Sequence, residues 1–301
     1  MVTIYGLGKI EKYKNPVVAL GVFDGVHRGH RKILKEAVKK ACDIGGKSIV
    51  LTFSPHPQKQ ESLYSLQHRL KLISELDIDI CIVVNFTKKF AQMSAEDFIS
   101  KVLVAKIRPK FIFVGRNFRF GKGARGDYKM LEDKSRDYNF KLKIFNVLKS
   151  ADKAISSTLI RKLIKSSRIR EAGALLGRRV AILGTVGRGS GLGKFLGFPT
   201  ANINPHHEII PAAGIYAVKI ILSGKTYNGA CYIGTRPTIS TLNKENRIEV
   251  HIFNFHKDIY GKTVEVQFLK LIRADKKFSS LAGLASQIRK DIVSCRKIHN
   301  I

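Results

Sequence analysis

The chain has 301 residues, of which 44% are apolar, and its 54 basic and 23 acidic side chains give a formal net charge of 54 − 23 = +31. This length and composition are typical of a globular protein with about two domains, and they argue against a disordered chain. No apolar run is as long as a membrane span, and the first residues lack the apolar core of a signal peptide. We therefore expect no membrane partner.

The large positive charge suggests a nucleic-acid-binding protein as one hypothesis. However, the basic residues are spread along the chain, their longest clusters are pairs such as Lys39-Lys40, and no recognised nucleic-acid module is present. This distribution favours solvated basic faces and no nucleic-acid partner. The four cysteines are widely spaced and form no Cys-x-x-Cys, which is typical of reduced thiols in a cytoplasmic protein: Cys42, Cys81, Cys231 and Cys295.

A strand, a glycine-rich turn and a helix are predicted at the start of the chain. Val17–Leu20 forms a short apolar run, and apolar residues recur at helical spacing from Arg28 onwards. The free N–H groups and partial positive charge of a helix start favour binding of an anion such as phosphate. His27 and His30 stand at this start, and Gly29 would let the anion approach the backbone.

Alternating strands and helices follow for about 150 residues. Residues 48–53 predict a second buried strand, followed by a rigid turn with Pro55 and His56 at the strand's carboxyl end, where α/β sheets bind ligands. Further strands are expected at 79–84, 111–114 and 141–147, and helices at 61–76 and after Ser94. The helix at 61–76 would bury Leu63, Leu66, Leu70, Ile73 and Leu76.

Two further segments of this half predict binding of phosphate or a planar ring. The loop GRNFRFGKGARGD offers glycines and cations for phosphates, and Phe118 and Phe120 for sandwiching a ring. The segment ISSTLIR begins a helix, with hydroxyls that can cap it and bind an anion and with Arg161 one turn further on. A mobile basic hairpin and a simply capped helix are the respective structural alternatives.

The pattern changes to short β-rich runs separated by turns from Val180 onwards. They predict a small antiparallel barrel with strands at 180–186, 214–222, 225–233, 248–255 and 263–272, followed by a helix at about 279–294. We therefore predict a Rossmann-like α/β domain at 1–165, a short helical linker at 166–178 and a β-barrel domain with a C-terminal helix at 179–301.

A glycine-rich loop and two oxygen-bearing side chains mark the chemistry of the barrel. Gly189, Gly191 and Gly193 accompany Lys194 in a loop that can fold over phosphates, although it lacks the Gly-Lys-Ser/Thr ending of a Walker loop. Next, Thr200 and Asn202 lie two residues apart, on one face of an extended chain, and offer a hydroxyl and an amide oxygen for Mg²⁺. From the residues alone, a β-turn with local hydrogen bonds is the favoured explanation of Thr200 and Asn202.

These motifs together resemble the bacterial bifunctional riboflavin kinase/FMN adenylyltransferase family. The resemblance rests on GVFDGVHRGH, TFSPHP and ISSTLIR in the first half, and on GFPTAN, PAAGIYAV, GTRPT, IEVHIFNF and LIRADKKFSS in the second. It covers nearly the whole chain. Two positions depart from the common pattern, since Asn117 and Tyr232 stand where many relatives carry Asp and Asn.

The resemblance implies that the first domain transfers AMP from ATP to FMN, giving FAD and pyrophosphate. It implies catalytic roles for His27, His30 and Arg161. The implied ATP- and phosphate-binding residues are Gly21, Phe23, Asp24, Gly29, Ser156, Ser157 and Thr158, and the implied flavin-binding residues are Pro55, His56, Asn117 and Phe118.

The second domain is implied to phosphorylate riboflavin with ATP. Glu249 would accept the proton of the ribityl hydroxyl, and Arg273 would contact the flavin. The glycine loop would bind the phosphates, and Thr200 and Asn202 would hold Mg²⁺. The expected protein is a monomer or weak homo-oligomer whose partners are riboflavin, FMN and ATP. Two alternatives are an enzyme that retains only one of these activities and the basic nucleic-acid-binding protein.

Overall fold

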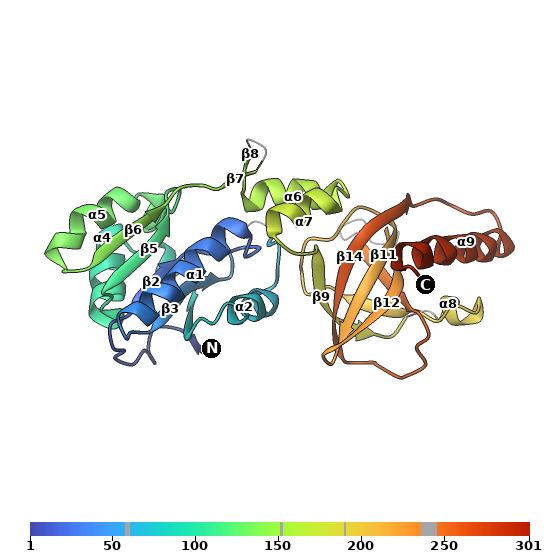
Figure 1. Ribbon diagram of the computed structural model, residues 1–301, viewed down its shortest axis with the longest axis horizontal. Helices are drawn as coiled ribbons and strands as arrows, with labels where there is room; N and C mark the ends of the chain where they lie inside the picture. The colour runs from blue at the N-terminus through green and yellow to red at the C-terminus, as the bar shows by residue number, and fades with distance from the viewer. Residues whose placement is uncertain (58–60, 151–152, 190, 236–245) are drawn as a thin grey trace. The chain divides into compact units, whose positions relative to one another are not determined.

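The computed structural model describes residues 1–301 apart from 58–60, 151–152, 190 and 236–245 (Figure 1). The chain folds as two compact units. The first comprises Met1–Ser62 and Leu66–Ser157, and the second comprises Leu63–Ser65 and Thr158–Ile301. Each unit has a hydrophobic core of its own. A three-residue segment from the first half of the chain therefore belongs to the second unit.

The first unit is built on a six-stranded parallel sheet with the order β1-β4-β3-β2-β5-β6. The strands are β1 (Val2–Tyr5), β2 (Val17–Leu20), β3 (Ser48–Ser54), β4 (Ile80–Asn85), β5 (Phe111–Gly115) and β6 (Lys141–Phe145). All four residues of β2 are buried, as expected for an apolar run at the centre of a sheet that is covered on both faces.

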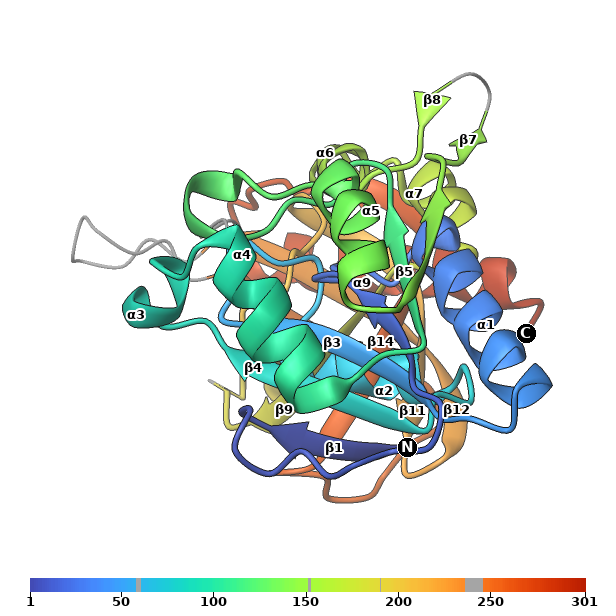
Figure 2. The same cartoon turned by 90° about the vertical axis from the view of Figure 1, so that its left-hand side faces the viewer.

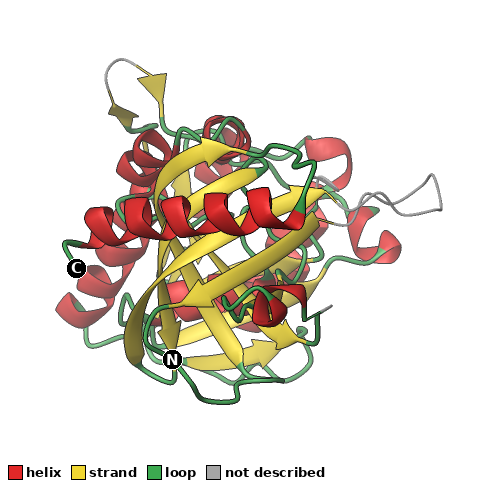
Figure 3. Ribbon diagram, turned by 90° about the vertical axis from the view of Figure 1, so that its right-hand side faces the viewer, coloured by secondary structure: helices red, strands yellow, loops and turns green. Residues whose placement is uncertain are grey.

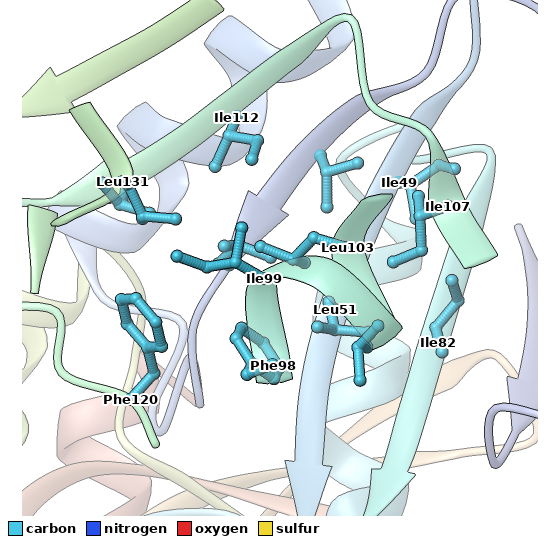
Figure 4. Close-up of a cluster of buried hydrophobic side chains, with 14 of the residues drawn as sticks. Ile49, Leu51, Ile82, Phe98, Ile99, Leu103, Ile107, Ile112, Phe120 and Leu131 are labelled. Carbon is cyan, nitrogen blue, oxygen red and sulfur yellow. The ribbon is translucent and has the colours of Figure 1, made fainter. Parts of the chain in front are cut away.

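Successive residues of a strand point to opposite faces of the sheet, so the apolar runs place apolar side chains on both faces. Helices cover both of these faces. Helix α1 (Arg28–Asp43) packs on β2, β3 and β5 (Figure 2). The π-helical segment η1 (Phe98–Ile107) and helix α5 (Tyr128–Asp137) supply Leu103 and Leu131 to the core that contains Ile49 and Ile112 (Figure 4). Helix α1 on one face, and η1 with α5 on the other, thus hold the sheet whose carboxyl edge carries the predicted site residues.

The remaining elements of the first half are short. They are α2 (Leu66–Ser74), α3 (Lys88–Ala91), α4 (Ala95–Asp97), the 3₁₀ turn η2 (Lys122–Ala124) and the hairpin of β7 (Lys149–Ser150) and β8 (Lys153–Ala154). Ser94 caps α4 by accepting a hydrogen bond from the Asp97 N–H, as predicted. The prediction for 61–76 was wrong in part: the helix begins at Leu66, and its buried face carries His68 and Arg69 while Leu66 and Leu70 are only half-buried.

The second unit is a closed barrel with the strand order β10-β13-β12-β11-β14-β9. The strands are β9 (Ala181–Gly187), β10 (Ala201–Asn204), β11 (Gly214–Leu222), β12 (Lys225–Thr235), β13 (Asn246–Ile252) and β14 (Thr263–Ala274), and every neighbouring pair is antiparallel. The helices of the unit are α6 (Ser157–Lys165), α7 (Ile169–Leu176), α8 (Leu192–Phe195) and α9 (Leu281–His299), of which α6 begins one residue before the unit does. Helix α9 lies across the strands of the barrel (Figure 3).

The predicted fold class, a Rossmann-like parallel α/β domain followed by an antiparallel barrel and a C-terminal helix, is confirmed. The segment predicted as a helical linker contains α7, which ends at Gly177 in the left-handed conformation that favours glycine. The extents of the two domains stay a prediction. Strands β1 and β10 and helix α5 were not predicted.

Candidate active sites

The turn between β2 and α1 arranges the two predicted histidines against each other. His27 caps α1, since its Nδ1 accepts a hydrogen bond from the His30 N–H at 3.3 Å. The two imidazole rings stack with their centroids 3.6 Å apart and an angle of 20° between their planes. His27 is buried, so the pair is a fixed feature of the helix start.

Two glycines of this turn lie in close contact with aromatic rings. A side chain at Gly29 would bring its Cβ to 3.1 Å from the His27 ring, and one at Gly21 would meet the Phe23 ring at 3.1 Å. The Phe23 ring in turn packs edge-on against His30, with the ring centroids 5.4 Å apart. Gly29, which we expected to admit an anion, thus also packs closely against the His27 ring.

The start of α6 adjoins the same turn. Asp24 is buried, and its carbonyl oxygen accepts a hydrogen bond from Ser157 Oγ at 2.8 Å. Ser156 precedes α6. Thr158 and Arg161 belong to the second unit, where Arg161 Nη1 lies 3.5 Å from Thr158 Oγ1.

The other predicted site residues of the first unit follow neighbouring strands. Strands β3, β2 and β5 are adjacent and parallel, so the segments after Leu20, Ser54 and Gly115 emerge at one edge of the sheet. Half-buried His56 follows β3 together with exposed Pro55, and exposed Asn117 follows β5.

The aromatic sandwich predicted in the loop after β5 is wrong. The rings of Phe118 and Phe120 stack directly on each other, with their centroids 5.6 Å apart, which leaves no space for a third ring between them. Phe120 is buried and packs against Phe98 in the core of the sheet. Only Phe118 is half-exposed and available to a ligand.

In the second unit, a pocket of about 350 Å³ brings several predicted residues together. Gly193, Thr200, Glu249 and Arg273 all line it. Leucine, isoleucine and phenylalanine side chains form much of the remaining wall, together with polar residues that were not predicted: Tyr232, Arg247, His251, Asp275, Lys276 and Asp291. An apolar pocket with a few convergent polar groups is typical of a small-molecule site.

Glu249 is one of the polar residues of this pocket. It lies on β13, opposite Asn202 of β10 and Tyr232 of β12 in the strand registers, and it forms an ion pair with Arg247. Its side chain is only 13% exposed. Burial, followed by the negative charge of Asp275, raises the pKa of Tyr232. The phenol therefore stays protonated and can donate a hydrogen bond within the pocket.

The glycine loop packs closely on the predicted magnesium ligands. A Cβ at Gly189 would overlap the Asn202 amide, and one at Gly193 would come within 2.9 Å of Thr200 Oγ1. Gly191 has φ = +75°, which favours glycine, and it precedes α8 with the exposed Lys194. Within the described residues, no cluster of three or more His, Cys, Asp or Glu side chains could hold a metal ion.

A second, smaller pocket of about 150 Å³ adjoins the same strands. Its wall includes Val250, Phe255, Lys257 and Tyr260. Thr200 lines both pockets. Thr200 is thus shared by the walls of the two pockets.

Arg273, the predicted flavin contact, is held in place by a buried carboxylate. Its Nη2 lies 2.8 Å from Asp291 Oδ2 and its Nε 3.0 Å from Asp291 Oδ1. The Gln287 amide donates to the same carboxylate at 2.9 Å, and the guanidinium lies over the Phe278 ring. This network fixes one cation at the pocket wall.

The comparisons with known proteins agree with the two units. Residues 9–159 match the family model described as FAD synthetase, and residues 176–299 match the one described as riboflavin kinase. The bifunctional riboflavin kinase/FMN adenylyltransferase of Buchnera aphidicola is 38% identical and covers 99% of this chain and 98% of its own. The chain belongs to this bifunctional family. The enzymes of the same name from Escherichia coli K12 and Listeria monocytogenes are 34% and 37% identical and cover 95% and 92% of this chain.

A solved structure shares the complete fold. It is described as a macrolide-efflux protein from Streptococcus pneumoniae, is 29% identical, covers 97% of each chain and has a TM-score of 0.84. In the described part of the present chain, no helix is both long and apolar enough to cross a membrane. The family predicted from the motifs is confirmed, although residues 236–238 of the GTRPT motif lie outside the described residues.

Proposed function

We propose that the protein makes FAD from riboflavin in two ATP-dependent steps. The second unit converts riboflavin and ATP into FMN and ADP, and the first converts FMN and ATP into FAD and pyrophosphate. Family membership supports both activities. The observation that carries the proposal is the convergence of Glu249, Thr200 and Arg273 on one largely apolar pocket.

The large pocket suits the flavin of the first step. Its apolar wall can bury an aromatic ring system, and Arg273 can bind the ring's polar edge because Asp291 holds the guanidinium in one orientation. The small pocket, which shares Thr200 with the large one, would take part of the nucleotide. The transferred phosphoryl group would then cross at Thr200, beside the glycine loop.

Glu249 is the proposed general base. Its carboxylate accepts the proton of the ribityl hydroxyl as the hydroxyl oxygen forms a bond to the γ-phosphorus and ADP leaves. The ion pair with Arg247 and the low exposure of the side chain keep the carboxylate oriented in the pocket. Such alignment provides much of the catalysis in phosphoryl transfer.

Thr200 and Asn202 would hold a magnesium ion. The fit is supported by the glycine loop, which lies so close to both side chains that a Cβ would fill the space beside their oxygens. A hydroxyl and an amide oxygen leave most of the ion's coordination to water and phosphate, as magnesium prefers. When bound, the ion would neutralise phosphate charge.

In the first unit, the turn after β2 and the start of α1 would bind the phosphates of the second ATP. His27, His30 and the helix N-terminus offer donors and positive charge at the α-phosphorus. The FMN phosphate oxygen attacks that phosphorus and pyrophosphate leaves. The FMN phosphate is already ionised at neutral pH, so the step requires alignment and no strong base. Pro55, His56, Asn117 and Phe118 would contact the flavin at the same edge of the sheet, and Ser156, Ser157, Thr158 and Arg161 would contact phosphate.

We place the protein in the cytoplasm because all four cysteines are free thiols. It would act as a monomer or weak homo-oligomer and bind no nucleic acid.

Two substitutions in the full chain test the assignment of the two sites. Glu249→Gln should slow riboflavin phosphorylation about 100-fold or more and leave FMN adenylylation nearly unchanged. His30→Ala should slow adenylylation to a similar extent and spare the kinase. His256→Ala, at an exposed histidine, is the control and should change neither rate. Equal loss of both activities in either active-site variant would contradict the assignment.

A further inference from the structure

Helix α2 contains a buried cation that contacts two segments of the first unit. The Arg69 side chain is only 4% exposed. Its Nη1 donates to the Val22 carbonyl at 2.9 Å, and its Nη2 donates to the Phe53 carbonyl at 2.8 Å. One rigid guanidinium thus joins the turn after β2 to the end of β3.

These two carbonyls lie beside the two binding segments of the proposed adenylyl-transfer site. Val22 immediately precedes Phe23 and Asp24, and Phe53 immediately precedes the turn that carries Pro55 and His56. Thr52 Oγ1 also donates to the Val22 carbonyl, at 2.9 Å. Because the guanidinium fork is planar and rigid, its two hydrogen bonds fix the spacing of the two segments.

A buried cation is costly unless nearby groups compensate it. Burial lowers the pKa of Arg69, and the negative charge of Asp24 acts in the opposite direction. The arginine therefore also provides a positive charge opposite the buried Asp24 of the turn. A leucine at this position would pack well but would leave the Val22 and Phe53 carbonyls without this donor.

We propose that Arg69 is a positioning residue for adenylyl transfer. Arg69 acts through the backbone of the nucleotide turn and of the flavin turn, and it need not touch either substrate. This inference rests on the proposed location of the adenylyl-transfer site.

The test measures both activities on full-length variants. Arg69→Lys keeps the charge but cannot make the same two-carbonyl bridge, so kcat/KM for FAD formation from FMN should fall about ten-fold or more. Riboflavin phosphorylation should stay within about two-fold of wild type in this variant. Thr87→Ala, which removes the hydroxyl that caps α3, is the control and should leave both activities unchanged.

Hydrogen exchange separates positioning from general destabilisation. In Arg69→Lys, the amides of residues 21–25 and those of Phe53, Ser54 and His56 should exchange faster while those of β4 and β5 keep their protection. Faster exchange over the whole sheet, or a kcat/KM for FAD formation within two-fold of wild type, would overturn the proposal. If the wild-type protein made no FAD, the proposed function would fail, but the exchange pattern would still show whether Arg69 holds the two turns together.

Discussion

The Arg273–Asp291 pair offers a direct test of how the kinase pocket is organised. The two side chains are joined by a bidentate ion pair on β14 and α9, and they are 21% and 6% exposed. Asp291→Asn removes the negative charge while preserving the shape of the side chain. The guanidinium then loses its compensating charge in a largely buried place.

The expected loss of stability follows from this burial. Breaking a fully buried ion pair by removing one partner costs about 3 to 5 kcal/mol. Because Arg273 keeps some contact with solvent and asparagine can still accept one hydrogen bond, we expect the free energy of unfolding of the second unit to fall by about 2 to 3 kcal/mol. The KM for riboflavin should rise about ten-fold, because Arg273 is no longer held in one orientation.

Denaturant unfolding and steady-state phosphorylation of riboflavin measure these two effects. The matched control is Glu171→Gln, which breaks an Arg168–Glu171 pair of similar geometry whose side chains are 52% and 55% exposed. That change should cost less than about 1 kcal/mol and should not alter the KM. An Asp291→Asn variant that matches wild type in both stability and KM would refute the reasoning.

Two further predictions follow from groups whose pKa is shifted by burial. Burial raises the pKa of Cys81 and of Cys295 to about 12 and also raises that of Cys231, whereas Cys42 is exposed. A maleimide should therefore label one thiol per native chain near neutral pH and all four thiols after unfolding. Mass spectrometry would count the labels. Rapid labelling of Cys231 in the native state would contradict this prediction. Burial also lowers the pKa of His299 below its usual 6.5, so the unfolded chain binds this proton at a higher pH than the folded chain does. The free energy of unfolding of the second unit should therefore fall as the pH drops below about 6.5, and His299→Gln should make that fall shallower; an unchanged slope would show that this histidine is not responsible.

Much of the fold could be predicted because burial leaves a periodic pattern in the sequence. Strand β11, with its alternating buried residues, was predicted with its observed ends. Strand β10 was missed because only Ile203 is buried among its four residues. Similarly, α5 buries only Leu131 in a mostly charged segment, and β1 is half-exposed at the sheet's edge. Elements that bury few residues show little apolar periodicity in the sequence and are therefore difficult to predict.

Two of the residues that sequence reasoning missed, Arg69 and Asp291, are charged residues on apolar stripes. Arg69 lies at helical spacing with Ile73 and Leu76, and Asp291 lies at such spacing with Ile288 and Cys295. A charged side chain in an apolar stripe becomes buried and needs a polar partner, so its position in the sequence indicates a buried ion pair or hydrogen bond. The partners themselves, two backbone carbonyls for Arg69 and an arginine of β14 for Asp291, depend on tertiary packing that no local pattern specifies.

The most direct measurement of the central claim is chromatography of flavins after the purified protein is incubated with riboflavin, ATP and Mg²⁺. We predict that FMN accumulates first and that FAD then forms at its expense, with ADP and pyrophosphate as the respective co-products. FMN alone would contradict the adenylyltransferase half of the account. Unchanged riboflavin, in a sample shown to be folded, would contradict both halves.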